Sequence, residues 1–102
     1  MISYFMSNIA IMEYLGQQIR QMRLNARFTQ EELAKRAGVS RGTVDNLEHG
    51  KGVKLESLIA ILRALQKLEI FNTFETNAVI SPILLAKAGG KNLQKVYKKR
   101  SK

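Results

Sequence analysis

The side chains of this chain that could do chemistry are mainly basic, and they favour the binding of a polyanion. Seventeen lysines and arginines stand against eight aspartates and glutamates in 102 residues, which gives a formal net charge of +9. All eight acidic residues lie between Glu13 and Glu75, whereas residues 87–102 carry seven basic residues and no acidic one. Much of the excess charge is therefore in a C-terminal tail, and nucleic acid is a natural partner for such a chain.

The same residue types speak against catalysis and metal binding. There is no cysteine, so neither a disulfide nor a thiolate metal site can form. His49 is the only histidine, and a residue at the end of a helix is its simpler interpretation. No serine has a suitable base and orienting acid, and no glycine pattern makes a phosphate loop. We therefore expect no enzyme, no metal and no cofactor.

Residues 28–50, FTQEELAKRAGVSRGTVDNLEHG, predict two short helices joined by a tight turn. Thr29 is a good N-cap, and Glu32 three residues later completes a capping box. Gly38 falls where the chain must reverse, because a positive φ costs glycine less than any other residue. Ser40 is a second N-cap, so a second helix begins directly after the turn.

This stretch resembles the Cro/CI (XRE) family of helix-turn-helix DNA-binding domains. The residues that carry the resemblance are the opening glutamine, a small residue where the helices cross, the turn glycine and the inner positions of both helices: Gln30, Leu33, Ala34, Gly38, Val39, Ser40, Val44, Leu47, Glu48 and Gly50. The resemblance runs from about Leu15 to Leu65. It implies an all-α, lambda-repressor-like bundle of about five or six helices.

The resemblance also implies that the helix over about residues 41–49 enters the major groove of DNA and reads bases with Arg41, Thr43 and Asn46. Arg41 could donate two hydrogen bonds to guanine, Asn46 could pair with adenine, and the Thr43 methyl could contact a thymine methyl. Gly42 departs from the longer polar side chain common in the family. This removes one reader and could admit a close approach of the backbone.

Phosphate contacts are expected from four residues around the motif: Gln30, Ser40, Lys51 and Lys54. Gln30 opens a helix, where free N–H groups and the helix dipole favour an anion. The simpler interpretation of the basic residues is solvated surface charge. The resemblance further implies an ion pair between Arg23 and Glu48, which would tie the first helix to the end of the third.

Apolar residues recurring at intervals of three or four predict the remaining helices. The expected helices cover residues 11–25, 30–37, 41–49, 55–65 and 67–74, and a sixth could cover 83–88. The expected organisation is an N-terminal arm over 1–11, a helix-turn-helix domain over 12–75, a C-terminal extension over 76–90 and a basic flexible tail over 91–102.

The two ends leave alternatives open. The apolar residues of the arm are better explained by packing on the core than by a dimer contact: Ile2, Tyr4, Phe5 and Ile9. The basic tail could be a solvated disordered end, a non-specific DNA arm or a segment that folds on a partner.

We expect a sequence-specific DNA-binding transcriptional regulator that binds double-stranded DNA as a homodimer, with half-sites roughly 34 Å apart. Repression by blocking a promoter is the simplest mechanism. The dimer contacts would involve the fifth helix and Val79–Leu85. No run approaches the roughly 18 apolar residues that a membrane span needs, and we see no export signal. The protein should therefore be soluble and cytoplasmic.

Two other functions compete with this one. The segment SPILLAKAGGK and the basic end resemble small regulators that accompany HipA-type kinase toxins, which would make the chain an antitoxin and autorepressor. The other alternative is a protein-interaction adaptor without specific DNA binding. The intact set Arg41, Thr43 and Asn46 argues against the adaptor, although Gly42 leaves room for it.

Overall fold

The computed structural model of the protein describes residues 1–76. Within them the elements are α1 (Asn8–Asn25), α2 (Gln30–Ala37), α3 (Arg41–Glu48), α4 (Leu55–Ala64) and the 3-10 helix η1 (Leu68–Phe74), without a strand. The expected all-α fold is confirmed. The sixth helix, the dimer segment Val79–Leu85 and the basic tail lie outside the described residues.

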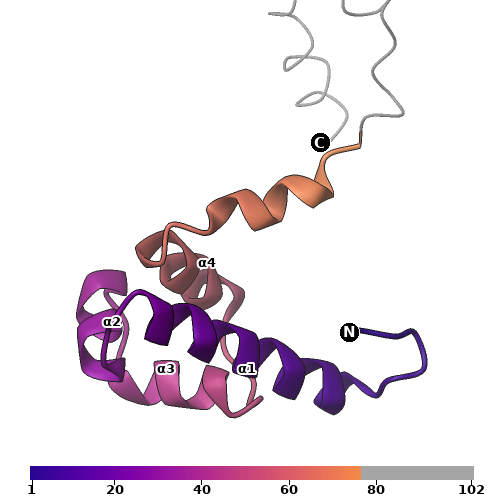
Figure 1. Cartoon of the computed structure of the whole chain (residues 1–102), viewed down its shortest axis with the longest axis horizontal. Helices are drawn as coiled ribbons and strands as arrows, with labels where there is room; N and C mark the ends of the chain where they lie inside the picture. Colours follow the sequence, from indigo (N-terminus) through magenta and orange to yellow (C-terminus); the bar gives the residue numbers. More distant parts are fainter. Residues whose placement is uncertain (77–102) are drawn as a thin grey trace, which may run out of the picture. The chain divides into compact units, whose positions relative to one another are not determined.

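Residues 1–70 form one compact unit, and residues 71–102 belong to a second. In the first unit α2 packs on α3 and α4, and α1 packs on α3 (Figure 1). The helix expected over residues 67–74 is present as η1, which crosses from the first unit into the second. No helix of residues 1–76 combines the length and apolar character that crossing a membrane requires.

The start of α1 differs from the expectation. The helix begins at Asn8 because Ser7 caps it: the Ser7 hydroxyl accepts a hydrogen bond from the Ala10 N–H at 3.0 Å. The segment before the helix is therefore residues 1–7, shorter than the arm over 1–11 that the sequence predicted.

The predicted caps of α2 and α3 are present. The Thr29 hydroxyl accepts from the Glu32 N–H at 3.0 Å, and the Glu32 carboxylate accepts from the Thr29 N–H at 2.8 Å. Gly38 ends α2 in the left-handed region with a φ of +73°. The Ser40 hydroxyl accepts from the Thr43 N–H at 3.0 Å. The caps at Thr29 and Ser40 set where the two helices begin, and Gly38 makes the turn between them.

The capping box makes stability depend on pH. The hydrogen bond from the Thr29 N–H lowers the pKa of the Glu32 carboxyl below its ordinary value, and the Thr29 hydroxyl and the Arg36 charge lower it further. A lowered folded-state pKa gives stability that is present above the ordinary pKa and is lost as pH falls through the lowered one. Urea unfolding over a pH series should therefore show wild type more stable than Glu32→Gln at pH 7 and equal to it in acid. A difference that persisted to about pH 2 would contradict this.

The core lies where α2, α3 and α4 meet. Its buried apolar residues come from all four α-helices and the turn after α4: Ile19, Leu33, Ala34, Val44, Leu47, Ile61, Leu62 and Leu65. Leu33, Val44 and Ile61 are completely inaccessible to solvent. Within α1, Ile19 is buried in this core, whereas Leu15 is exposed.

Glycines allow α1 and α3 to approach closely. A Cβ built on Gly16 would collide with the backbone oxygen of Leu47 and lie 2.7 Å from that of Glu48. A Cβ on Gly50, whose φ is +77°, would lie 2.8 Å from the Cα of Glu13. The backbone of α1 therefore contacts the end of α3 at Gly16 and the turn after α3 at Gly50, and a side chain at either glycine would force these segments apart.

The N-terminal segment does not pack on the core as expected. A backbone hydrogen bond from the Met6 N–H to the Ser3 oxygen, at 3.1 Å, makes a turn in this segment. Tyr4 and Phe5 lie on this turn and are fully exposed to solvent. The interpretation of these apolar residues as additional core packing is therefore wrong.

Candidate nucleic-acid interface

One side of α3 anchors the helix and the other is free. Val44, Leu47 and Glu48 are buried, whereas Arg41 and Asn46 are exposed and Thr43 is half-buried. Figure 1 shows α3 beside α1 and α2. Val44, Leu47 and Glu48 lie three and four residues apart and so define the inner face of the helix. Asn46 projects away from this face, and Arg41 is exposed as the first residue of α3.

The Thr43 hydroxyl is used inside the motif. It lies 2.9 Å from the Ser40 hydroxyl, and the Ser40 oxygen also accepts the Thr43 N–H. The methyl group is therefore the part of Thr43 that is left for an apolar contact. This suits the expected contact with a thymine methyl, which stays a prediction.

The glycine at position 42 is not required by the fold. A Cβ built there would meet only the Ser40 hydroxyl oxygen, at 3.8 Å, which is an ordinary contact. Position 42 is exposed on the free side of α3. The missing side chain therefore leaves the helix backbone accessible next to Arg41.

A buried ion pair lies directly behind α3. The Arg23 Nε donates to the Glu48 Oε2 at 2.6 Å, and the Arg23 Nη2 donates to the Glu48 Oε1 at 3.1 Å. Both side chains are almost fully buried. The Arg23 Nη1 also donates to the Phe28 oxygen at 2.8 Å. The ion pair that the resemblance implied is thus present, and it joins α1, the loop before α2 and the end of α3.

Gln30 connects this ion pair to the outer side of α3. Its Nε2 donates to the Glu48 Oε1 and to the Asp45 Oδ1, each at 3.1 Å. The side-chain amide nitrogen therefore binds two carboxylates, and the group that Gln30 can offer to a phosphate is its backbone N–H at the start of α2. Glu31 and Glu32 lie in the same first turn and oppose an anion there.

The other expected phosphate contacts are all exposed. Ser40 caps α3, Lys51 follows it, and Lys54 precedes α4 without capping it through its side chain. Their positions leave both ammonium groups available near α3 and α4. Contact with phosphate remains a prediction for each of them.

Asp45 and His49 were not predicted as part of the surface. The His49 Nδ1 donates to the Asp45 backbone oxygen at 2.9 Å and lies 3.3 Å from the Asp45 Oδ1. The Asp45 side chain is 44% exposed and the His49 side chain is 64% exposed. Asp45 is four residues from both Arg41 and His49, so helical spacing could have shown that the three share one side of α3. The surface therefore carries a carboxylate among its basic and polar groups.

Removing the Asp45 charge should strengthen binding to random-sequence DNA. Asp45→Asn keeps the oxygen that accepts from Gln30 but removes repulsion of the phosphates, so we expect affinity to rise roughly threefold to tenfold at low salt and less at high salt. Fluorescence anisotropy measures this. Glu69→Gln, which removes an exposed carboxylate from η1, should change little. Weaker binding of Asp45→Asn to every DNA would contradict the prediction.

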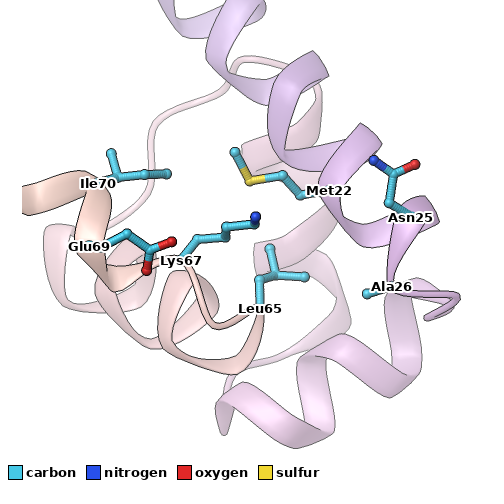
Figure 2. A pocket seen from close by; sticks show the side chains of 7 residues that line it. All are labelled: Met22, Asn25, Ala26, Leu65, Lys67, Glu69 and Ile70. Atoms are coloured by element: carbon cyan, nitrogen blue, oxygen red, sulfur yellow. The ribbon is translucent and has the colours of Figure 1, made fainter.

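A separate groove of about 510 Å³ lies between the end of α1 and the segment after α4, and Figure 2 shows its lining side chains: Met22, Asn25, Ala26, Leu65, Lys67, Glu69 and Ile70. None of the expected DNA-contacting residues lines it. Within residues 1–76, no three His, Cys, Asp or Glu side chains lie close enough together to hold a metal ion.

Comparison with known proteins finds a family model described as helix-turn-helix, which matches residues 19–70. The match begins within α1, covers α2, α3 and α4, and ends within η1. No curated protein matches the chain significantly.

Proposed function

Because the chain belongs to the Cro/CI (XRE) family of helix-turn-helix DNA-binding transcriptional regulators, we propose that it is a sequence-specific regulator that reads the major groove with α3. The observation that carries the proposal is the division of α3 into two faces. Val44, Leu47 and Glu48 hold the helix in the domain, while Arg41 and Asn46 are exposed. A helix held from one side and polar on the other can enter the groove without losing its packing.

The proposed base contacts follow from side-chain chemistry. The Arg41 guanidinium has the geometry for guanine O6 and N7, and the Asn46 amide has a donor and an acceptor for adenine N7 and N6. The Thr43 methyl would contact thymine. We propose that Lys51, Lys54, Ser40 and the Gln30 N–H bind phosphates and so set the position of α3 rather than its base preference.

We further propose that the protein acts as a dimeric repressor. A single α3 reads only a few base pairs, and two copies related by a two-fold axis double the site that is read. A dimer occupying a promoter would exclude polymerase. Sedimentation at micromolar concentration tests this part, because a monomer there would remove it.

The proposal is tested by anisotropy on DNA from the chain's own upstream region and on scrambled DNA, over a salt series. We expect a preference of about a thousandfold for the upstream DNA, lost in Asn46→Ala. Equal affinity for both DNAs, with a steep salt slope and no effect of Asn46→Ala, would mean that charge alone binds DNA. The domain would then act as an adaptor.

Arg41→Ala should relax base preference at one position of the site. The variant loses a bidentate contact, so binding to the preferred DNA should weaken by about 1–3 kcal/mol. Binding to scrambled DNA should weaken much less, by the loss of one positive charge. Equal losses on both DNAs would show that Arg41 contacts only phosphate.

The antitoxin function is a narrower form of the same proposal. It rests on the resemblance of residues 81–91, which lie outside the described residues. Co-purification with a kinase-like protein encoded nearby would separate an antitoxin from an ordinary repressor. DNA binding by α3 is common to both.

A further inference from the structure

The N-terminal turn presents two aromatic side chains to solvent. The Met6 N–H donates to the Ser3 oxygen at 3.1 Å, and the Phe5 N–H donates to the Ser3 hydroxyl at 3.1 Å. These bonds hold residues 3–6 in a compact turn, with Tyr4 and Phe5 adjacent on it. Neither ring is covered by the domain.

The exposed apolar surface extends beyond the two rings. We define the apolar arm as residues 1–9, in which four large apolar side chains beyond Met1 are exposed: Ile2, Tyr4, Phe5 and Ile9. Neighbouring apolar side chains of this size, left in water together, mark an interaction surface rather than ordinary scatter.

The lack of charged side chains in the arm disfavours DNA as the occupant. Residues 1–12 form the longest run of the chain without a charged side chain, in a protein of net charge +9. Binding to DNA relies on lysine and arginine at the phosphates, and this run has none. Two copies of so basic a protein repel each other, and that repulsion is weakest where neither copy presents a charged side chain.

We propose that the apolar arm of one copy packs on the apolar arm of a second copy, in a two-fold symmetric contact led by Tyr4 and Phe5. This deepens the proposed function, because it names a surface that holds the DNA-binding dimer, and it rests on that function only for the role of the dimer. The same patch meets itself across a two-fold axis, so no second complementary surface is needed.

The area suits a weak dimer. A buried tyrosine or phenylalanine covers roughly 150–250 Å², so the four rings of two arms bury about 600–1,000 Å². Adding Ile2 and Ile9 from each copy brings the total toward about 1,200 Å², the lower limit of specific interfaces. We therefore expect dissociation in the micromolar range.

The arm is connected to α3 through ordered structure. Ser7 caps α1 directly after the turn, and α1 crosses α3 backbone to backbone at Gly16. Pairing of the arms would therefore fix the two copies of α3 relative to each other. The contact would act on the spacing of the two half-sites as well as on assembly.

Sedimentation of the full chain without DNA, from about 1 to 100 µM, tests the contact. The variant Tyr4→Ser with Phe5→Ser should raise the dimer dissociation constant at least about 30-fold, since hot-spot aromatic residues carry most of an interface. Phe74→Ser removes an aromatic ring that is 78% exposed on η1, where the sequence had placed the dimer contact, and it should leave the dimer intact because the arms form the contact. An unchanged melting temperature shows that the variants fold.

Two results would overturn the inference: a monomeric wild type over the whole range, or a dimer that Phe74→Ser dissociates and the arm variant does not. DNA of one half-site separates this inference from the proposed function. The arm variant should bind a single half-site as wild type does and lose tighter binding to two half-sites. Failure of wild type to prefer any half-site would count against base reading and leave the arm contact standing.

Discussion

Glu48→Ala should lower the free energy of unfolding by about 3–5 kcal/mol, the largest loss that we expect from a single substitution. The Arg23 guanidinium would stay buried, with the Phe28 oxygen as its remaining acceptor. Gln30 would keep only Asp45 as an acceptor. A buried charge without its counterion is far less stable than the same charge in water.

Urea and thermal unfolding measure this loss, and the melting temperature should fall by more than about 10 °C. Where the variant is still folded, its affinity for DNA should match that of wild type, because Glu48 is on the inner face of α3. The double variant Arg23→Met with Glu48→Leu should recover much of the stability, since it removes both charges and keeps the volume filled. An unchanged melting temperature for Glu48→Ala would refute the structural role of the pair.

Gly16→Ala should lower the free energy of unfolding by about 3 kcal/mol, although alanine is the better residue inside a helix. The added methyl group would collide with the backbone carbonyl oxygens of Leu47 and Glu48. Rotation of a side chain cannot relieve a collision with backbone. The helices must separate, and the core between α1 and α3 opens with them.

Gly42→Ala is the matched control. It is the same substitution, also within a helix, but the new methyl group would lie in open space 3.8 Å from the Ser40 hydroxyl. Its free energy of unfolding should stay equal or rise by up to about 1 kcal/mol. If urea unfolding showed equal changes for both alanine variants, the close approach of α1 to α3 would not be the reason for Gly16.

The helix-turn-helix could be predicted because its signals are local. The caps at Thr29 and Ser40 each join residues three apart, and the turn at Gly38 depends on one backbone angle. A short stretch of sequence is therefore enough to predict them. The start of α1 was predicted too late because Ser7 has Ala10 where a capping box would have an acid or an amide.

Contacts between distant elements were harder to predict. The sequence favoured Ala34 as the small residue at a helix crossing, and Ala34 is indeed buried. Gly16 contacts Leu47 and Glu48, about thirty positions later in the chain, and no residue near Gly16 in the sequence indicates that contact. The exposure of Tyr4 and Phe5 was missed for the same reason, because an apolar pattern indicates burial without saying what covers the residue.

The surface of α3 was predicted mainly by resemblance, which named residues position by position. It could not show how Gln30 would divide its amide between two carboxylates, because that depends on distances between α2 and α3. The place of Asp45 on this surface could have been predicted from the sequence, since helical spacing puts it between Arg41 and His49.

The two faces of α3 give the protein freedom to evolve. Because Arg41, Gly42 and Asn46 take no part in the core, a lineage could exchange them one at a time while the domain kept its stability, and under the proposed function each exchange would alter the operator. Gly42 is an open position, since a single mutation there would add a side chain to the exposed surface of α3 where none exists. After duplication of such a gene, the two proteins could therefore come to bind different DNA sites while they keep the same fold.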